Sequence, residues 1–226
     1  MGAGLDALIA RLAVHGLAVT GAFHPTHRDG VPGLAPEAVA TLCLVGPVDG
    51  AMWQAFRAAP EAGDGGAHPM DRWSHRVIGA AAAAEGGEAL FPFQGPPWLP
   101  FLRWAMRAEG AAGSPLGMVV TPTRGLLAAW RGAVVLPGRR PLPAPPGPLP
   151  CAACHAPCRT ACPADAFAGG AYDAVRCRTF LAEAEGAVCR DGGCQARRAC
   201  PASWPMPPEQ ATFHLDAFRR SSRTGA

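Results

Sequence analysis

The most informative segment of the sequence is Cys151-Ala-Ala-Cys154-His-Ala-Pro-Cys158-Arg-Thr-Ala-Cys162-Pro163. Three cysteines packed this tightly can wrap one cubane iron–sulfur cluster, whereas a fourth cysteine followed by proline usually turns away to a second cluster. Four more cysteines follow, at Cys177 and in Cys189-x4-Cys194-x5-Cys200-Pro201. The repeated Cys-Pro unit therefore predicts two clusters whose ligand sets cross.

The crossed pattern is that of two-cluster ferredoxins, and we predict two [4Fe–4S] clusters. Cluster one takes Cys151, Cys154, Cys158 and Cys200, and cluster two takes Cys162, Cys177, Cys189 and Cys194. Two structural zinc sites are the main alternative, but zinc sites favour paired Cys-x2-Cys knuckles and only one such pair is present. Three residues, 155–157, separate the second and third cysteines, whereas bacterial ferredoxins have two residues there. The nuclearity of cluster one therefore stays open.

Composition limits the other classes of function. All 20 basic side chains are arginine, the net charge is only +3, and the arginines are scattered, so we expect no nucleic-acid partner. No apolar run approaches the roughly 20 residues of a membrane span, so we expect no membrane partner. The start, Met1-Gly-Ala-Gly-Leu-Asp6, has no signal-peptide pattern, which predicts a cytoplasmic protein. Cytosolic thiols stay reduced, which favours metal ligation over disulfides; Cys43, alone in an apolar run, is expected to be a buried thiol.

Helical and strand patterns alternate along the first part of the chain, which predicts an α+β fold. We expect a domain over residues 1–137, a proline-rich linker over 138–150, and a ferredoxin-like domain with a C-terminal tail over 151–226. Helices are expected over residues 5–19, 51–59, 70–84, 99–108 and 213–220, and the last six residues are expected to be disordered. Strands are expected over residues 17–23, 40–45 and 88–93, and over a hairpin formed by 117–120 and 132–136.

Several segments of the first domain resemble the cobalamin-processing family of the CblC type. They are Leu42-Cys-Leu-Val-Gly-Pro-Val48, Met52-Trp-Gln-Ala-Phe56, His68-Pro-Met-Asp71 and the long run from Val119 to Pro137. The order of the two domains is similar to that of epoxyqueuosine reductase and the reductive dehalogenases, as is the stretch 103–120. The resemblance implies a corrin-binding nitroreductase-like (flavin reductase-like) α/β domain followed by a two-cluster ferredoxin module.

The resemblance also implies which residues contact cobalamin. The run from Phe91 to Trp98 is aromatic and proline-rigid, so it suits a large flat ligand, although such a segment can equally be plain core or turn. Thr121 stands where the CblC family has His, which favours base-off cobalamin without a side-chain ligand. Asp71 and His75 share a helix face and could hold a proton together, or Asp71 could simply cap the helix. The predicted contacts are Phe91, Phe93, Gln94, Trp98, Thr121, Gly125, Trp130 and Gly132.

These observations predict an oxidoreductase in which two clusters pass electrons to base-off cobalamin, for reductive removal of its upper ligand. An external ferredoxin or flavodoxin would supply the electrons, and no catalytic residue is assigned. The alternatives are a cobalamin-dependent reductase of an organic substrate and a ferredoxin-type carrier without its own substrate; a flavin in the first domain is a further alternative. Positive charge on Arg159, Arg197 and Arg198 is expected to raise the cluster potentials, the alternative being ordinary solvated surface charge, while His155 is expected to face solvent.

Overall fold

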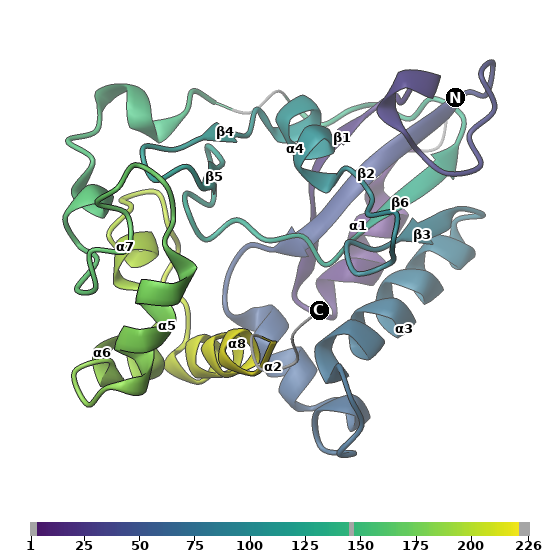
Figure 1. The fold of residues 1–226 in the computed structure, drawn as a ribbon. Helices are drawn as coiled ribbons and strands as arrows, with labels where there is room; N and C mark the ends of the chain where they lie inside the picture. The colour runs from purple at the N-terminus through teal and green to yellow at the C-terminus, as the bar shows by residue number, and fades with distance from the viewer. Residues whose placement is uncertain (1–3, 145–146, 222–226) are drawn as a thin grey trace. The chain divides into compact units, whose positions relative to one another are not determined.

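The computed structural model describes residues 4–144 and 147–221, and its contacts divide the chain into two compact units (Figure 1). The first unit is Met1–Ala111 with Ala129–Pro146, and the second is Ala112–Ala128 with Gly147–Ala226. The units differ from the expected domains at residues 112–128, which group with the cysteine-bearing part. Of the predicted disordered end, residues 222–226 lie outside the described residues.

The first unit is built on a four-stranded antiparallel sheet with the order β1-β2-β6-β3. The strands are β1 (Leu17–Phe23), β2 (Ala40–Pro47), β3 (Glu88–Leu90) and β6 (Gly132–Pro137). Every residue of β2 is buried, because this strand is mainly apolar and pairs on both sides, with β1 and β6. Burial on both faces explains why β2 lacks the apolar–polar alternation of a half-exposed strand.

Helices α1 (Asp6–Ala13), α2 (Ala51–Arg57), α3 (Pro69–Ala84) and α4 (Phe101–Glu109) complete the first unit. Helix α3 packs against β3 and β6, and α4 packs against β1 and β2. The buried side chains of α3 recur at helical spacing, which is why this segment forms an amphipathic helix. They are Met70, Trp73, Ser74, Val77, Ile78, Ala81 and Ala82.

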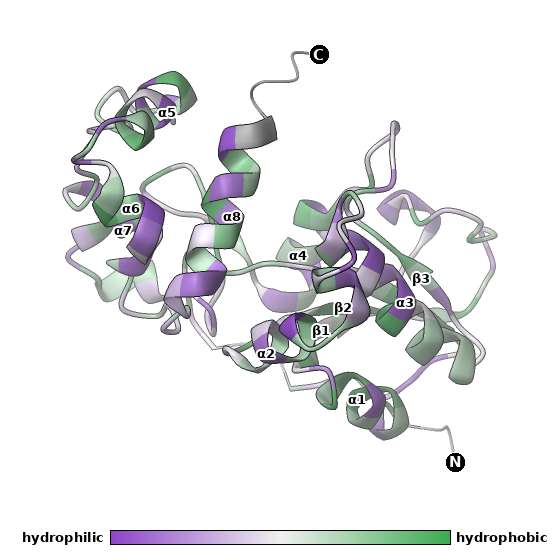
Figure 2. Ribbon diagram, turned by 90° about the horizontal axis from the view of Figure 1, so that it is seen from below, coloured by the Kyte–Doolittle hydropathy of each residue, from purple (hydrophilic) through white to green (hydrophobic). Residues whose placement is uncertain are grey.

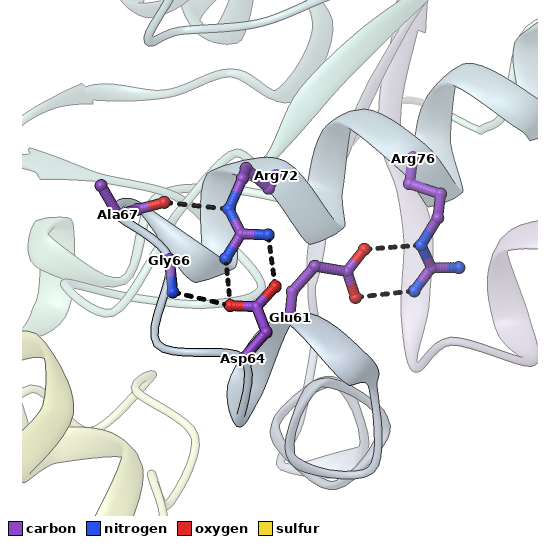
Figure 3. Close-up of polar contacts among 6 residues, drawn as sticks. All are labelled: Glu61, Asp64, Gly66, Ala67, Arg72 and Arg76. Atoms are coloured by element: carbon purple, nitrogen blue, oxygen red, sulfur yellow. Dashed lines mark hydrogen bonds and ion pairs between the residues drawn. The ribbon is translucent and has the colours of Figure 1, made fainter.

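Two ion pairs fasten the start of α3 to the 3-10 turn η2 (Pro60–Ala62) (Figure 3). Arg76 binds both carboxylate oxygens of Glu61, at 2.6 and 2.9 Å. Arg72 binds both oxygens of Asp64, at 2.7 and 2.6 Å, and its Nε donates to the carbonyl of Ala67. The hydrogen bonds from Arg76 are the main reason that the pKa of Glu61 is lowered to about 2. The loop between η2 and α3 is thus held by charge-assisted pairs.

The second unit consists of short elements joined by turns. It contains a two-stranded sheet of β4 (Ala112–Gly113) and β5 (Val119–Val120), the 3-10 turns η3 (Pro150–Ala153) and η4 (Pro157–Arg159), and four helices. The helices are α5 (Ala174–Ala182), α6 (Ala187–Gly192), α7 (Gln195–Arg198) and α8 (Pro208–Ser221). Hydrophilic and hydrophobic bands alternate along α8, as expected for a helix with one apolar face (Figure 2).

The predicted α+β class is confirmed, with a small antiparallel sheet. The predicted hairpin of residues 117–120 with 132–136 is wrong: β5 pairs with β4, whereas β6 lies between β2 and β3. The apolar sequence of β6 suits a strand paired on both sides, and Gly117, with φ of 73°, turns β5 back toward β4. Strand β3 ends at Leu90, and the C-terminal helix begins at Pro208, five residues before the predicted start. No helix among residues 4–144 and 147–221 is long and apolar enough to span a bilayer.

Candidate metal centres

The first group of cysteines surrounds a small cavity in the second unit. Cys151 lies on η3, Cys158 lies on η4, and Cys200 follows α7. Together with Cys154 they line a cavity of about 20 Å³, which is room for roughly one water molecule. Burial, then the charges of Cys200 and Cys154, raise the pKa of the Cys151 thiol. These thiols are close enough to repel one another as thiolates, and side-chain rotation must widen the cavity before a cluster can enter.

The second group surrounds a larger and mainly apolar cavity of about 270 Å³. Cys177 lies on α5, which begins after Asp173, whose carboxylate accepts a hydrogen bond from the Arg176 amide at 2.9 Å. Cys189 lies on α6, and Cys194 immediately precedes α7. Cys162 completes the set, at the start of the turn that Pro163 continues.

Electrostatic interactions divide the eight thiols in the same way. Burial raises the pKa of Cys189, and the charges of Cys194, Cys162 and Cys177 raise it further. The pKa of Cys158 is likewise raised by burial and then by Cys200, Cys151 and Cys154. The two sets coincide with the predicted ligand sets, while ligation itself stays a prediction. Among the described residues no three His, Cys, Asp or Glu side chains converge on a single metal-ion position.

Helix α8 supplies one wall of the second cavity. Its lining residues recur at helical spacing, so a single face of the helix lies against the cysteines. They are Ala211, His214, Leu215 and Phe218. Sequence analysis gave this helix no role, although its apolar residues three and four positions apart could have indicated a buried face.

Two further side chains of the second cavity have positions that the sequence did not predict, or predicted only in part. Tyr172 lines this cavity beside Cys177, and its ring stacks on Phe167 with centroids 5.2 Å apart. Arg197 also lines the cavity, and its Nε donates to the carbonyl of Leu126 at 2.7 Å. By contrast, Arg159 and His155 are exposed. Arg198 also lines the second cavity and donates to the carbonyl of Gly192, so two of the three arginines predicted near the ligands face this cavity.

The eight predicted cobalamin contacts do not gather in one unit. Thr121 and Gly125 belong to the second unit, and the other six belong to the first. Gly125 has φ of +55°, and a Cβ atom there would lie 2.9 Å from Cys200 Sγ and 2.7 Å from the backbone of Ala202. The lack of a side chain therefore lets this loop approach a predicted cluster ligand. Thr121 is fully buried, and its hydroxyl accepts a hydrogen bond from the Arg124 amide at 3.2 Å.

In the first unit, most of these residues make contacts that stabilise the fold. The buried ring of Phe91 stacks on both His75 and Phe93, with centroids 5.0 and 5.1 Å away. Gln94 accepts a hydrogen bond from the Phe91 amide at 2.9 Å, which closes a local turn. Trp98 is 67% exposed. A Cβ on Gly132 would lie 3.0 Å from Ile78, and Trp130 Nε1 donates to Glu109 at 2.6 Å.

The predicted proton-sharing pair and the lone cysteine of the first unit have other partners. Asp71 binds Arg131 at 2.5 Å, and Arg131 also donates to Ser74 at 3.0 Å. His75 stacks on Phe91, so Asp71 and His75 lie on one helix but are engaged separately. Cys43 is fully buried in β2, and burial raises its pKa to about 12. Cys43 thus remains a protonated thiol at neutral pH.

The first unit has an open cleft of its own, formed by the end of β1, helix α4 and the segment 139–144. The cleft has a volume of about 670 Å³, and its lining includes Phe23, His24, Arg107 and Arg139. Arg107 lies over the Phe23 ring and binds Asp29 at 2.5 Å, whereas Arg139 is exposed.

No protein-family model matches the chain, and no similar curated protein sequence is found.

Proposed function

We propose that the second unit holds two [4Fe–4S] clusters and that the chain is an electron-transfer protein. The observation that carries this proposal is the grouping of eight cysteines, four and four, around two cavities of one unit. Cys200 returns to the first set while Cys162 crosses to the second, as in two-cluster ferredoxins. A structural zinc site instead needs thiolates that meet at one ion. Thiols spread around a 270 Å³ cavity suit a cubane, whose irons lie at separate corners.

When bound, such clusters accept and donate single electrons at low potential. The polypeptide has three tasks: it holds the thiolates, excludes water and oxygen, and sets the potential through neighbouring dipoles and charges. The apolar lining of the second cavity, with a wall from α8, performs the second of these tasks.

The test is anaerobic reconstitution of the full chain, followed by iron and sulfide analysis and low-temperature paramagnetic resonance. We expect about eight iron and eight sulfide per chain. Cys177→Ala should lose up to half of this iron, whereas Cys43→Ala should retain all of it, because Cys43 lies buried in β2. Bound zinc without sulfide would contradict the proposal, as would iron loss confined to Cys43→Ala.

A second function is cobalamin reduction by the first unit, fed by the clusters. The resemblance to cobalamin-processing proteins and to epoxyqueuosine reductase suggests it. The cleft lined by Phe23, Arg107 and Arg139 is one open site of the first unit, with a volume of about 670 Å³, although none of the eight predicted cobalamin contacts lines it. Single electrons from the clusters would reduce base-off cobalamin: one electron would take cobalt(III) to cobalt(II) with loss of the upper ligand as an anion, and a second would give cobalt(I).

Adding hydroxocobalamin to the anaerobic protein tests this second function. Binding should shift the corrin spectrum toward the base-off form at micromolar concentration, and Arg139→Ala should weaken that shift. With dithionite as reductant, Cys194→Ala should slow cobalt reduction without abolishing binding. An unchanged spectrum would remove the cobalamin proposal and leave an electron carrier, while flavin binding in the same assay would favour a flavin-dependent first unit.

A further inference from the structure

Polar side chains line the second cavity beside its four thiols. They are Tyr172, Gln195, Arg197, Arg198 and His214. The Ala166 amide donates to Cys162 Sγ at 3.4 Å, and Tyr172 lies beside Cys177 in the cavity wall. Tyr172 is the only tyrosine of the chain. Its hydroxyl is a hydrogen-bond donor that is neutral at neutral pH.

A positive charge lies beside the same set. The Arg197 guanidinium lines the second cavity and is anchored by its hydrogen bond to the carbonyl of Leu126. Burial lowers the pKa of Arg197, but an arginine side chain in a protein stays protonated. Its charge acts on Cys194, whose pKa it lowers against the larger effect of burial.

Fewer contacts of this kind reach the first set in the part of the chain that the structure describes. The Ala156 amide donates to Cys154 Sγ at 3.4 Å. Among the described residues that line the first cavity, Ser114 is the one polar side chain beside the four cysteines. Polar side chains and positive charge are therefore concentrated around the second set.

We propose that the second cluster has the higher reduction potential of the two, and that Tyr172 and Arg197 are the positioning residues that raise it. This inference rests on the proposed function. Reduction adds one negative charge to a cluster, and donors to its sulfur ligands together with a nearby cation stabilise that charge. The apolar lining opposes reduction, but the same low polarity strengthens each hydrogen bond and the attraction of Arg197.

The potential order fixes the direction of electron flow within the unit. The reduced first cluster loses one electron, and the oxidised second cluster gains it, with no bond made or broken and no proton moved. An external low-potential one-electron donor then reduces the first cluster again. The second cluster is thus the electron store of the unit.

The single tyrosine allows a direct test. Ring-labelled tyrosine in the anaerobically reconstituted protein should give one nuclear resonance, from Tyr172, and reduction of the nearer cluster should shift it. We expect the main shift with the first electron of a stepwise dithionite titration. A resonance that moves only with the second electron would overturn the proposed order.

Variants test the two positioning residues by a redox titration monitored by paramagnetic resonance. Tyr172→Phe keeps the ring stacked on Phe167 and removes only the hydroxyl, so it should lower the higher potential and leave the lower one unchanged. Arg197→Gln should act in the same direction, while the exposed control Arg159→Gln should shift neither potential appreciably. The inference would be overturned if the variants lowered the potential of the second reduction step, or if both variants left the two potentials unchanged. A wild-type protein without bound iron and sulfide would instead contradict the proposed function itself.

Discussion

Gly125 is the residue at which backbone conformation bears most directly on the predicted first cluster. We expect Gly125→Ala to reduce the iron bound by the first set and to lower the stability of the second unit. The new Cβ would lie 2.9 Å from Cys200 Sγ and 2.7 Å from the backbone of Ala202, where little can yield. The left-handed conformation adds strain of about 1–2 kcal/mol for a residue with a side chain.

Iron analysis and thermal unfolding measure this effect, with Gly113→Ala as the matched control. A Cβ on Gly113 meets no atom within 4 Å, and that position does not have a positive φ. Full iron content in Gly125→Ala would show that this loop does not constrain the first set.

The ion pair of Glu61 with Arg76 makes the stability of the first unit depend on acid pH. The pKa of Glu61 is lowered from 4.5 to about 2, chiefly by the hydrogen bonds from Arg76. A lowered folded-state pKa stabilises the protein above the unfolded-state value, and this contribution is lost as the pH falls from about 4.5 to about 2. The contribution is roughly 0.5 kcal/mol, because Arg76 is half exposed.

Glu61→Gln should therefore destabilise the protein at pH 7, and by a smaller amount at about pH 3. Denaturant unfolding of the wild type and the variant at both pH values measures the difference. The exposed Glu37→Gln serves as control. A destabilisation that is equal at both pH values would mean that Glu61 acts through packing rather than charge.

At the scale of single residues, sequence analysis could predict the grouping of the cysteines because their spacing along the chain determines which of them can meet. It could not predict the role of Tyr172, since its place beside Cys177 in the cavity wall depends on how the turn before α5 folds. Arg197 was expected to lie near the ligands, but its inward position depends on Leu126, a residue 71 positions away in the sequence. Long-range backbone contacts of this kind leave no local pattern.

At the scale of elements, the strands of the first unit were predictable where they are continuous and apolar. Strand β1 has the predicted bounds, Leu17–Phe23. The partners of β5 and β6 were not predictable from proximity in sequence, because β2 and β3 pair with the two edges of β6, while β5 pairs with β4. Pairing the apolar strand β6 on both edges thus determines its position, rather than the short connection that a hairpin with β5 would have.

Helix α8 should protect the second cluster from oxygen and water. Leu215→Ser introduces a polar group into the wall of the second cavity, so the cluster should lose its visible absorption in air several-fold faster. Ala217→Ser, at an exposed position of the same helix, should behave like the wild type. Equal rates for both variants would show that α8 does not shield the cluster.

At the scale of the whole molecule, the cysteine-bearing unit is assembled from two separate segments. Leu116, Val120 and Leu126 belong to its buried core together with Cys158 and Cys200. The boundary predicted in the proline-rich segment assigns this loop to the first domain instead. Proline content indicates a stiff linker, but it does not indicate which unit the loop before the linker joins. Part of that segment also remains with the first unit: the Gly138 amide donates to Val39, and the Arg140 amide donates to Thr41.

This discontinuity predicts the result of cutting the chain. A fragment of residues 138–226 contains all eight cysteines that line the two cavities, yet it lacks Leu116, Val120 and Leu126. It also lacks the carbonyl of Leu126 that holds Arg197. After anaerobic reconstitution it should hold less iron than a fragment of residues 112–226, and the loss should include the first set, whose cavity Leu126 lines. Loss of this core exposes apolar surface at about 25 cal/mol per Å², which a unit of this size cannot easily offset. Equal iron in both fragments would mean that the loop 112–128 packs on the cysteine unit without stabilising it.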